Sequence, residues 1–326
     1  MTNTEKASRR LVDPELLQAL DKLPDYIVSS GRLADIRAER AAAAPPLASL
    51  ADAQIMREEV WVPGTPGAPD VRLILTRQRA ATQPQPLLLF IHGGGFVFGT
   101  AEGTGISDMR LARATGCAVA SVDYRLAPET RAPGQVEDCY AALAWCHREA
   151  GSLSFDPERM AVGGISAGGG LAANLALMVR DRNEMTLRLQ MLFCPILDDQ
   201  TAARPVPAHL GEFVWTPQTN AFGWTALTGG EPGHTEIPPY TVAARAADLR
   251  GVAPAFIDVG ALDLLVLESL AFASRLIESA VPTELHVHPG AYHGYELLPG
   301  VLVAERAHRL RAEALSRAFE VPSGRG

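Results

Sequence analysis

A G-x-S-x-G motif at residues 164–168 constrains this chain more than any other feature of its sequence. It follows a short apolar run, residues 159–164, and precedes an Ala- and Leu-rich run, residues 171–180. The first run predicts a strand and the second predicts a helix, so the motif marks a sharp strand-to-helix turn. Glycines on both sides of the serine remove the Cβ atoms that would collide in such a turn. The turn would hold the Ser166 hydroxyl exposed at its crest, where a nucleophile is needed.

A second glycine motif, H-G-G-G at residues 92–95, follows the continuous apolar run of residues 86–91. Such a run predicts a strand that is buried on both faces of a parallel sheet. Successive glycines allow the backbone to approach a carbonyl oxygen closely. We predict that the N–H groups of Gly93 and Gly94 form an oxyanion hole, joined by the N–H of Ala167, the residue after the serine.

The serine needs a base to accept its proton, and six histidines follow it in the chain. His293 is the best candidate, because it lies on a tight turn after the strand-like residues 283–288. His286 and His288 alternate along that strand, so they share one face, which we interpret as polar or half-buried. A zinc site formed by His286, His288 and His293 is an alternative, but it lacks a carboxylate or thiolate at ligand spacing. The other three histidines (209, 234 and 308) have no comparable setting.

An acid must orient the histidine and stabilise its imidazolium without taking the proton itself. Asp263 is the preferred candidate, because it falls just past the strand-like residues 256–260, on a loop that can reach the histidine. Asp258 is the other carboxylate of the same segment, but it lies within the strand. Asp198 and Asp199, after the strand-like residues 191–195, are the runner-up.

The remaining pattern predicts an α/β fold. From residue 87 onward strand-like and helix-like runs alternate, which indicates parallel strands joined by crossover helices. Residues 55–63 and 70–78 instead alternate as a pair of antiparallel strands. Two segments depart from this order: residues 1–50 are partly amphipathic and helical, and residues 198–250 are rich in Pro, Gly, Thr and aromatic residues.

Five ordered blocks resemble the bacterial hormone-sensitive-lipase-like family of α/β-hydrolases. The resemblance implies the α/β-hydrolase fold, with a mostly parallel eight-stranded sheet flanked by helices. It implies a single domain over residues 1–326, with a helical cap built from residues 1–50 and from an insertion after strand 6, residues 198–250. The blocks are residues 92–96, 123–129, 164–168, 260–263 and 293–294.

By this resemblance, the chain is expected to be a serine carboxylesterase that hydrolyses short- to medium-chain esters through an acyl-enzyme. Ser166, Asp263 and His293 would form the catalytic triad, with no cofactor and no metal. Three residues or segments depart from the family pattern. Ile165 before the serine should leave the chemistry intact, the mostly uncharged residues 264–268 after the acid leave substrate preference open, and Tyr295 after His293-Gly294 replaces the more common Phe. An amidase or lactonase would use the same triad, and comparing an aryl ester with its anilide would separate them. A non-catalytic small-molecule-binding scaffold is a further alternative, which the intact triad disfavours.

Two groups of residues receive other interpretations. We interpret His92 and the block 123–129 as structural, with His92 bracing the glycine loop and with Arg125 and Glu129 buried and paired beneath the site. Four aromatic residues in the 198–250 insertion form either an apolar wall of the substrate pocket or the packing between cap and sheet. These are Phe213, Trp215, Phe222 and Trp224.

Composition excludes several partners. A net charge of −8 and a pI near 5.5 argue against nucleic acid. No run approaches the ~20 apolar residues of a membrane span, so we expect no stable membrane anchoring. Four cysteines without a C-x-x-C pair indicate reduced thiols in a cytoplasmic protein. The resemblance adds a homodimer formed near residues 282–318.

Overall fold

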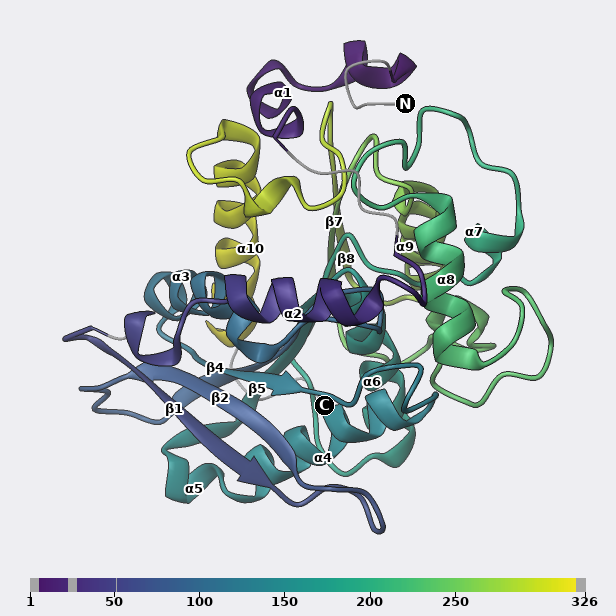
Figure 1. Ribbon diagram of the computed structural model, residues 1–326. Helices are drawn as coiled ribbons and strands as arrows, with labels where there is room; N and C mark the ends of the chain where they lie inside the picture. The colour runs from purple at the N-terminus through teal and green to yellow at the C-terminus, as the bar shows by residue number, and fades with distance from the viewer. Residues whose placement is uncertain (1–5, 23–27, 51, 321–326) are drawn as a thin grey trace.

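The computed structural model describes residues 6–22, 28–50 and 52–320, so residues 1–5 and 23–27 of the predicted cap segment lie outside the described residues (Figure 1). The described residues contain an eight-stranded sheet with the order β1-β2-β4-β3-β5-β6-β7-β8. The β1–β2 and β2–β4 pairs are antiparallel, and the other neighbours are parallel. This confirms the predicted sheet. The strands are β1 Ile55–Val62, β2 Val71–Gln78, β3 Gln85–Ile91, β4 Ala118–Asp123, β5 Phe155–Ile165, β6 Leu189–Phe193, β7 Ala255–Gly260 and β8 Thr283–His288.

Helices cover both faces of the sheet. Helices α4, α6 and α9 cover one face with the larger apolar core, and α3 and α10 cover the other. The helices are α1 Pro14–Leu20, α2 Leu33–Ala43, α3 Gly105–Thr115, α4 Gly134–Arg148, α5 Ala150–Leu153, α6 Ala167–Arg182, α7 Gln200–Ala203, α8 Pro217–Thr228, α9 Val266–Glu278 and α10 Leu302–Glu320, with 3-10 turns at Ala7–Leu11, Leu47–Leu50, Ala101–Thr104, Ala243–Arg245 and Tyr295–Leu297.

Burial explains why these sequences form strands in the middle of the sheet. Strand β3 is buried at every position except Pro86, as expected for an apolar run with helices on both sides. Strand β1 lies at one edge of the sheet, and its side chains alternate between more buried and more exposed positions, with Trp61 exposed. The parallel strands β3 and β5–β8 end at a common edge of the sheet, and the loops that follow them carry the predicted site residues.

Helix α6 begins at Ala167, directly after the serine, and not at Leu171 as its composition predicts. Glycines at 168–170 have low helix propensity, which hides this first turn from a pattern-based prediction. The tertiary structure requires them: a Cβ on Gly168 would lie 2.0 Å from the carbonyl oxygen of Ile91, and one on Gly170 would lie 2.0 Å from that of Ile196.

Two parts of the chain cover the edge where the parallel strands end. In the N-terminal part, helix α1 packs into an apolar cluster with Phe213, Tyr292 and Tyr295. Helix α2, which crosses the front of the molecule in Figure 1, packs against Val97 and Ala127. Helix α8 lies in the segment after β6, beside α7. Among the described residues, no helix combines the length and the apolar character needed to cross a bilayer.

Candidate active site

Ser166 lies at the turn between β5 and α6 in a strained backbone conformation, with φ 58° and ψ −118°. Its own backbone holds it there: its N–H donates to the Phe193 carbonyl at 2.8 Å, and its carbonyl accepts from the N–H of Ile196 at 3.0 Å. A residue forced into such a sparsely populated region persists only where its surroundings determine it. The turn therefore projects the hydroxyl in a defined direction, as the G-x-S-x-G motif predicts. The prediction that Ser166 is exposed at the crest of the turn is wrong, because the glycine loop after β3 lies against it and leaves it 5% exposed.

A continuous hydrogen-bonded chain joins three of the predicted residues. The Ser166 Oγ lies 3.0 Å from Nε2 of His293, and Nδ1 of the same ring lies 2.7 Å from Oδ2 of Asp263. All three side chains are buried. With Nδ1 protonated toward the carboxylate, Nε2 is left free to accept the serine proton. The geometry is that of a nucleophile, its base and the group that orients the base.

The charge environment of His293 favours its protonated form. Burial acts to lower the pKa of His293, but the charge and hydrogen bond of Asp263, with a smaller effect from Glu296, outweigh it and raise the pKa above its ordinary value. A histidine that has taken a proton from a serine becomes an imidazolium, and a neighbouring carboxylate stabilises that positive charge.

The alternative acids are engaged elsewhere. Asp258 forms a buried two-bond ion pair with Arg311 of helix α10, with N–O distances of 2.7 and 2.8 Å. Asp199 forms a similar pair with Arg245. Asp198 caps the backbone N–H of Gln200. None of these carboxylates hydrogen bonds to a histidine in the described part of the chain.

The zinc alternative of His286, His288 and His293 is not assembled among the described residues. His286 hydrogen bonds to Glu284 at the half-exposed edge of β8, and His288 is buried beside Tyr295. The ligating side chains that do converge within the described residues are Cys194, Asp263 and His293, whose donor atoms lie within 4.8 Å of one another.

The glycine loop after β3 lies directly against the serine. A Cβ on Gly93 would lie 3.0 Å from the Ile165 carbonyl oxygen and 3.3 Å from the Ser166 Cβ. Gly94 has φ +116°, and a Cβ there would lie 2.0 Å from the Phe98 carbonyl oxygen. Among the described residues, no acceptor takes a hydrogen bond from the N–H of Gly93 or Gly94. Two unengaged N–H groups beside a serine suit the binding of an anionic oxygen.

His92 lies beneath this loop, away from the proton-transfer chain. Its ring stacks on Tyr124, with ring centroids 4.3 Å apart, and its Nδ1 lies 2.8 Å from the Gly93 carbonyl oxygen. The Tyr124 hydroxyl donates to the His92 carbonyl at 3.1 Å. Burial lowers the pKa of His92, so the ring stays neutral. These contacts brace the loop.

The prediction that Arg125 and Glu129 are both buried beneath the site is wrong for Glu129, which is exposed, and Arg125 is half-buried. Arg125 forms an ion pair with the buried Asp138 at 2.7 Å, and its own side chain is 29% exposed. The Glu129 side chain is 63% exposed and pairs with Arg37 of helix α2. The partner of Glu129 comes from the N-terminal segment, so the local sequence gives no sign of it.

The four aromatic residues of the insertion divide between the two expected roles. Trp215 reaches the site: its indole lies 5.8 Å from the His293 ring between centroids, and a Cβ on Gly95 would lie 2.3 Å from its Cη2. Its Nε1 donates to Asn220 of α8 at 3.2 Å, which fixes the ring. The other three pack the insertion onto neighbouring segments. Trp224 contacts Phe96, Phe213 contacts Tyr292, and Phe222 packs against the apolar cluster that contains Ile36 of α2.

Glu296 is a buried carboxyl near the site that the motifs do not identify. The Cys194 thiol donates to its Oε1 at 3.8 Å. Burial raises the pKa of Glu296, against the attraction of Arg311. The one available signal is its place three residues after His293, where the 3-10 turn Tyr295–Leu297 returns the chain toward the core.

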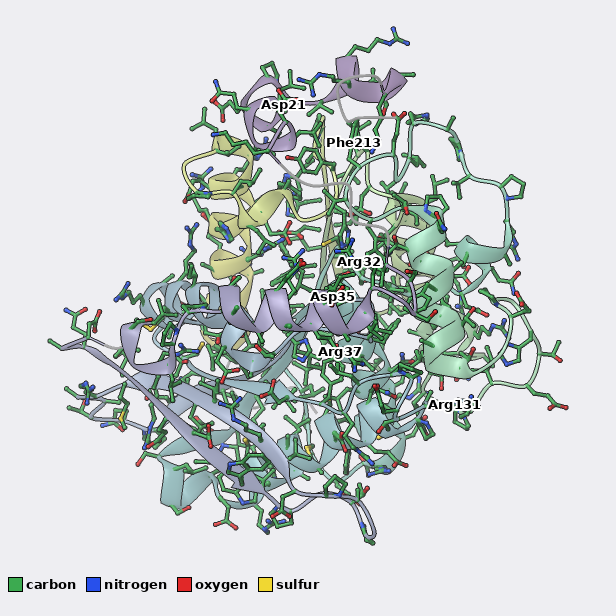
Figure 2. The ribbon with its side chains drawn as sticks, viewed as in Figure 1. Asp21, Arg32, Asp35, Arg37, Arg131 and Phe213 are labelled. Carbon is green, nitrogen blue, oxygen red and sulfur yellow. The ribbon has the colours of Figure 1, made fainter. Side chains whose placement is uncertain are left out.

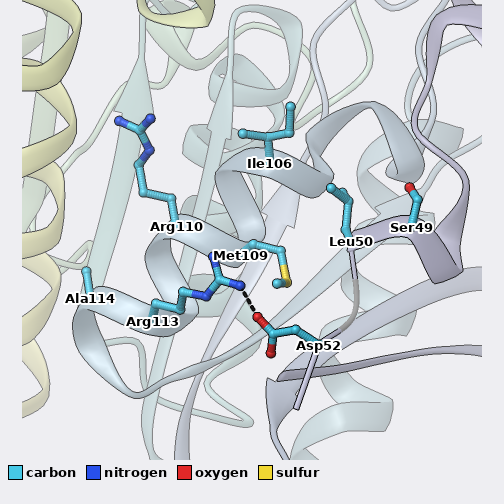
Figure 3. A pocket seen from close by; sticks show the side chains of 8 residues that line it. All are labelled: Ser49, Leu50, Asp52, Ile106, Met109, Arg110, Arg113 and Ala114. Carbon is cyan, nitrogen blue, oxygen red and sulfur yellow. Dashed lines mark hydrogen bonds and ion pairs between the residues drawn. The ribbon is translucent and has the colours of Figure 1, made fainter. Parts of the chain in front are cut away.

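A cavity of about 640 Å³ lies elsewhere, between the turn Leu47–Leu50 and helix α3 (Figure 3). Arg113 and Asp52 form an ion pair across part of it. It shares no residue with the hydrogen-bonded chain, and it has no nucleophile paired with a base.

Comparison with known proteins identifies the family and the fold. A family model described as the alpha/beta hydrolase fold matches residues 88–297. The carboxylesterase NlhH of Mycobacterium tuberculosis is 31% identical over 293 residues, covering 87% of this chain and 88% of the relative. The solved structure of a bacterial heroin esterase superposes with a TM-score of 0.89 at 37% identity, over 97% of this chain and 100% of that chain. Esterase LipW from Mycobacterium marinum gives a TM-score of 0.85 at 32% identity, over 98% and 100%. The chain therefore belongs to the α/β-hydrolase family, in the hormone-sensitive-lipase-like branch that its sequence motifs indicate.

Proposed function

We propose that Ser166, His293 and Asp263 are the catalytic triad of a serine carboxylesterase that acts on short- to medium-chain esters. The observation that carries the proposal is the hydrogen-bonded chain from Ser166 Oγ to Asp263, with distances of 3.0 and 2.7 Å. The chain is a carboxylic ester hydrolase, as its relatives named carboxylesterase and esterase are. The proposal concerns which residues form the triad, which N–H groups bind the oxyanion and which esters the enzyme accepts.

The proposed reaction passes through an acyl-enzyme. Ser166 Oγ attacks the ester carbonyl carbon while Nε2 of His293 takes the hydroxyl proton. The N–H groups of Gly93, Gly94 and Ala167 hold the resulting oxyanion. His293 then protonates the leaving alcohol, and the carbonyl re-forms as the acyl-enzyme. A water molecule, deprotonated by the same histidine, attacks this ester and releases the acid and the free serine.

Amides and lactones present the same carbonyl to the same triad, so the acylation machinery does not separate these substrates. The relatives' names favour esters. Comparing a p-nitrophenyl ester with the matching p-nitroanilide measures the preference directly. The intact triad also disfavours a binding module, because such a scaffold has no use for a base that is hydrogen-bonded to a strained serine.

The chain-length limit is proposed to come from Trp215. Its indole lies between Gly95 of the glycine loop after β3 and the ring of His293, so it borders the place where a substrate carbonyl would sit. On p-nitrophenyl esters from C2 to C12 we expect turnover that is highest at short to medium acyl chains. Trp215→Ala is expected to move this optimum toward longer chains, raising the C10 to C4 ratio of kcat/KM about tenfold.

Trp61→Ala is the matched control for that experiment, because Trp61 is 59% exposed on β1, at the far edge of the sheet. This variant is expected to leave the chain-length profile unchanged. A Trp215→Ala profile that coincides with that of the native protein would remove Trp215 from the pocket wall.

The pH dependence of kcat/KM follows from the state of His293. The base must be neutral to accept the serine proton, so activity is expected to fall as the pH drops through the His293 pKa. That pKa is raised above the ordinary value of 6.5, so the acid limb should lie above pH 6.5. A profile recorded between pH 5 and 9 in buffers of constant ionic strength measures it. A limb at or below pH 6.5 would contradict the proposed environment of the base.

The cap, the compartment and the oligomer are part of the proposal. Helices α1, α2 and α8, which cover the edge of the sheet that carries the site, support a cap built from residues 1–50 and 198–250. Four free, buried cysteines are consistent with a cytoplasmic protein. Strand β8 lies at the edge of the sheet with Val287 39% exposed, which supports a homodimer through residues 282–318.

A further inference from the structure

The loop that carries the proposed oxyanion donors is strained. Within residues 92–99, here called the oxyanion loop, Gly94, Gly95, Phe96 and Gly99 all have φ between +59° and +116°. Phe96 is the unusual member, because a side chain rarely adopts φ near +68°. Such a loop keeps its shape only if contacts from outside over-determine it. Those contacts therefore bear on where the Gly93 and Gly94 N–H groups point.

Arg37 of helix α2 supplies several of these contacts. Its Nε donates to the Val97 carbonyl at 2.7 Å, and its Nη2 donates to the Ala127 carbonyl at 2.8 Å. Nη1 and Nη2 also donate to the two Glu129 oxygens, at 2.8 Å each. One guanidinium thus joins the N-terminal helix, the oxyanion loop and the residues after β4.

The same three segments are joined by independent contacts. The Ala127 N–H donates to the Phe96 carbonyl at 2.9 Å, so the segment that Arg37 holds is itself bonded to the strained residue. Ile36, Val97 and Ala127 belong to one buried apolar cluster on the same side of α2. In Figure 2 the label of Arg37 lies below α2, the label of Arg32 lies above the helix and the label of Asp35 lies over it.

We propose that Arg37 is a positioning residue for catalysis: its guanidinium holds the oxyanion loop so that the Gly93 and Gly94 N–H groups face the substrate carbonyl oxygen. The inference rests on the proposed esterase function. It also gives the N-terminal helix α2 a part in transition-state stabilisation that is separate from any contact with the substrate.

The contacts to carbonyl oxygens matter more than the ion pair. The Glu129 side chain is 63% exposed, and an exposed pair of this kind contributes little to stability. The carbonyls of Val97 and Ala127 are fixed backbone acceptors, which the planar guanidinium reaches in different directions. A lysine has one compact ammonium and does not reproduce this fork. Arg37→Lys should therefore fail to restore function, although it keeps the charge.

The test compares Arg37→Met with Arg32→Met, which lies on the same helix. The Arg32 side chain is 57% exposed, and its ion pairs with described residues are two contacts of 3.7 Å, to Asp35 and Glu39. For Arg37→Met we expect kcat on p-nitrophenyl butyrate to fall about 10- to 100-fold, the size of effect that follows a small misplacement of catalytic groups. KM should stay within about twofold, because ground-state binding does not need the oxyanion donors. Arg32→Met should match the native enzyme, and Arg37→Lys should resemble Arg37→Met.

A second measurement isolates the oxyanion hole. An alkyl trifluoromethyl ketone adds to the serine as a tetrahedral adduct, and its affinity should fall in Arg37→Met by the same factor as kcat. Millimolar methylguanidinium should restore part of the activity of Arg37→Ala, because the Arg37 side chain is 29% exposed and so open to a small solute. The same addition should leave the native-like rate of Arg32→Ala unchanged. Activity that is lost through a general folding defect would not be restored by methylguanidinium.

The proposal is overturned if inhibitor affinity is unchanged while kcat falls, or if Arg37→Met and Arg32→Met are kinetically alike. Failure of the esterase function itself would look different, because the native protein would then turn over no ester. Far-UV circular dichroism and a thermal melt of each variant accompany the kinetics, and a native-like melt for Arg37→Met assigns the loss to the loop.

Discussion

Replacing Ser166 with alanine is expected to lower kcat on p-nitrophenyl esters by about 10⁶-fold, to a residual rate set by binding and the oxyanion donors alone. The hydroxyl oxygen is the atom that forms the acyl-enzyme, and among the described residues no hydrogen bond brings another nucleophile to Nε2 of His293 in its place. The measurement is steady-state hydrolysis by the native and variant proteins in parallel, with a pre-steady-state burst of p-nitrophenol in the native protein as the sign of acylation.

Ser269→Ala is the matched control for this substitution. Ser269 is also buried, but its hydroxyl donates to the Leu265 carbonyl within helix α9. It should retain native kinetics apart from a small change in stability. If Ser166→Ala kept native turnover, the nucleophile would be another residue and the proposed triad would fail.

Asp263→Asn is expected to lower kcat by about 10⁴-fold without altering the fold. The amide is nearly the same size as the carboxylate, but it offers an N–H where His293 Nδ1 needs an acceptor at 2.7 Å. The ring is then held in the wrong tautomer, with Nε2 protonated toward the serine. The charge of Asp263 also raises the pKa of His293, so whatever activity remains should have its acid limb at lower pH than the native enzyme.

Asp198→Asn tests the alternative acid under the same conditions. The Asp198 side chain caps the N–H of Gln200 and hydrogen bonds to no histidine of the described chain, so the variant should keep near-native kcat. A loss in Asp198→Asn that equals the loss in Asp263→Asn would contradict the assignment of the acid. A native acid limb in Asp263→Asn would contradict the electrostatic account of His293.

The sequence predicted the family and the fold because both depend on short-range patterns. A fully apolar run before the glycine loop indicates a strand buried on both faces, and the alternation of such runs with helices indicates a parallel sheet. The resemblance then supplied the eight strands, which the observed order confirms. The strand-to-helix turn at Ser166, the loop just past a strand at Asp263 and the tight turn at His293 led to the same three residues that the structure brings into hydrogen-bonding contact.

Contacts between segments far apart in the sequence were decided by the tertiary structure alone. Glu129 was expected to be buried, yet it is exposed and paired with Arg37, which precedes it by 92 residues. Of four aromatic residues in the insertion, Trp215 is the one whose ring lies beside His293, and no local pattern distinguishes it from Trp224.

The physical reason is the range of the forces involved. Strand and helix patterns, tight turns and the glycines of the two motifs record constraints within a few residues, so the sequence by itself determined the fold class, the nucleophile's turn and the candidate base. Pairing of a side chain depends on which distant segment packs beside it. Only the tertiary structure decided that Asp258 pairs with Arg311 and that Arg37 of helix α2 donates a hydrogen bond to the Val97 carbonyl of the oxyanion loop.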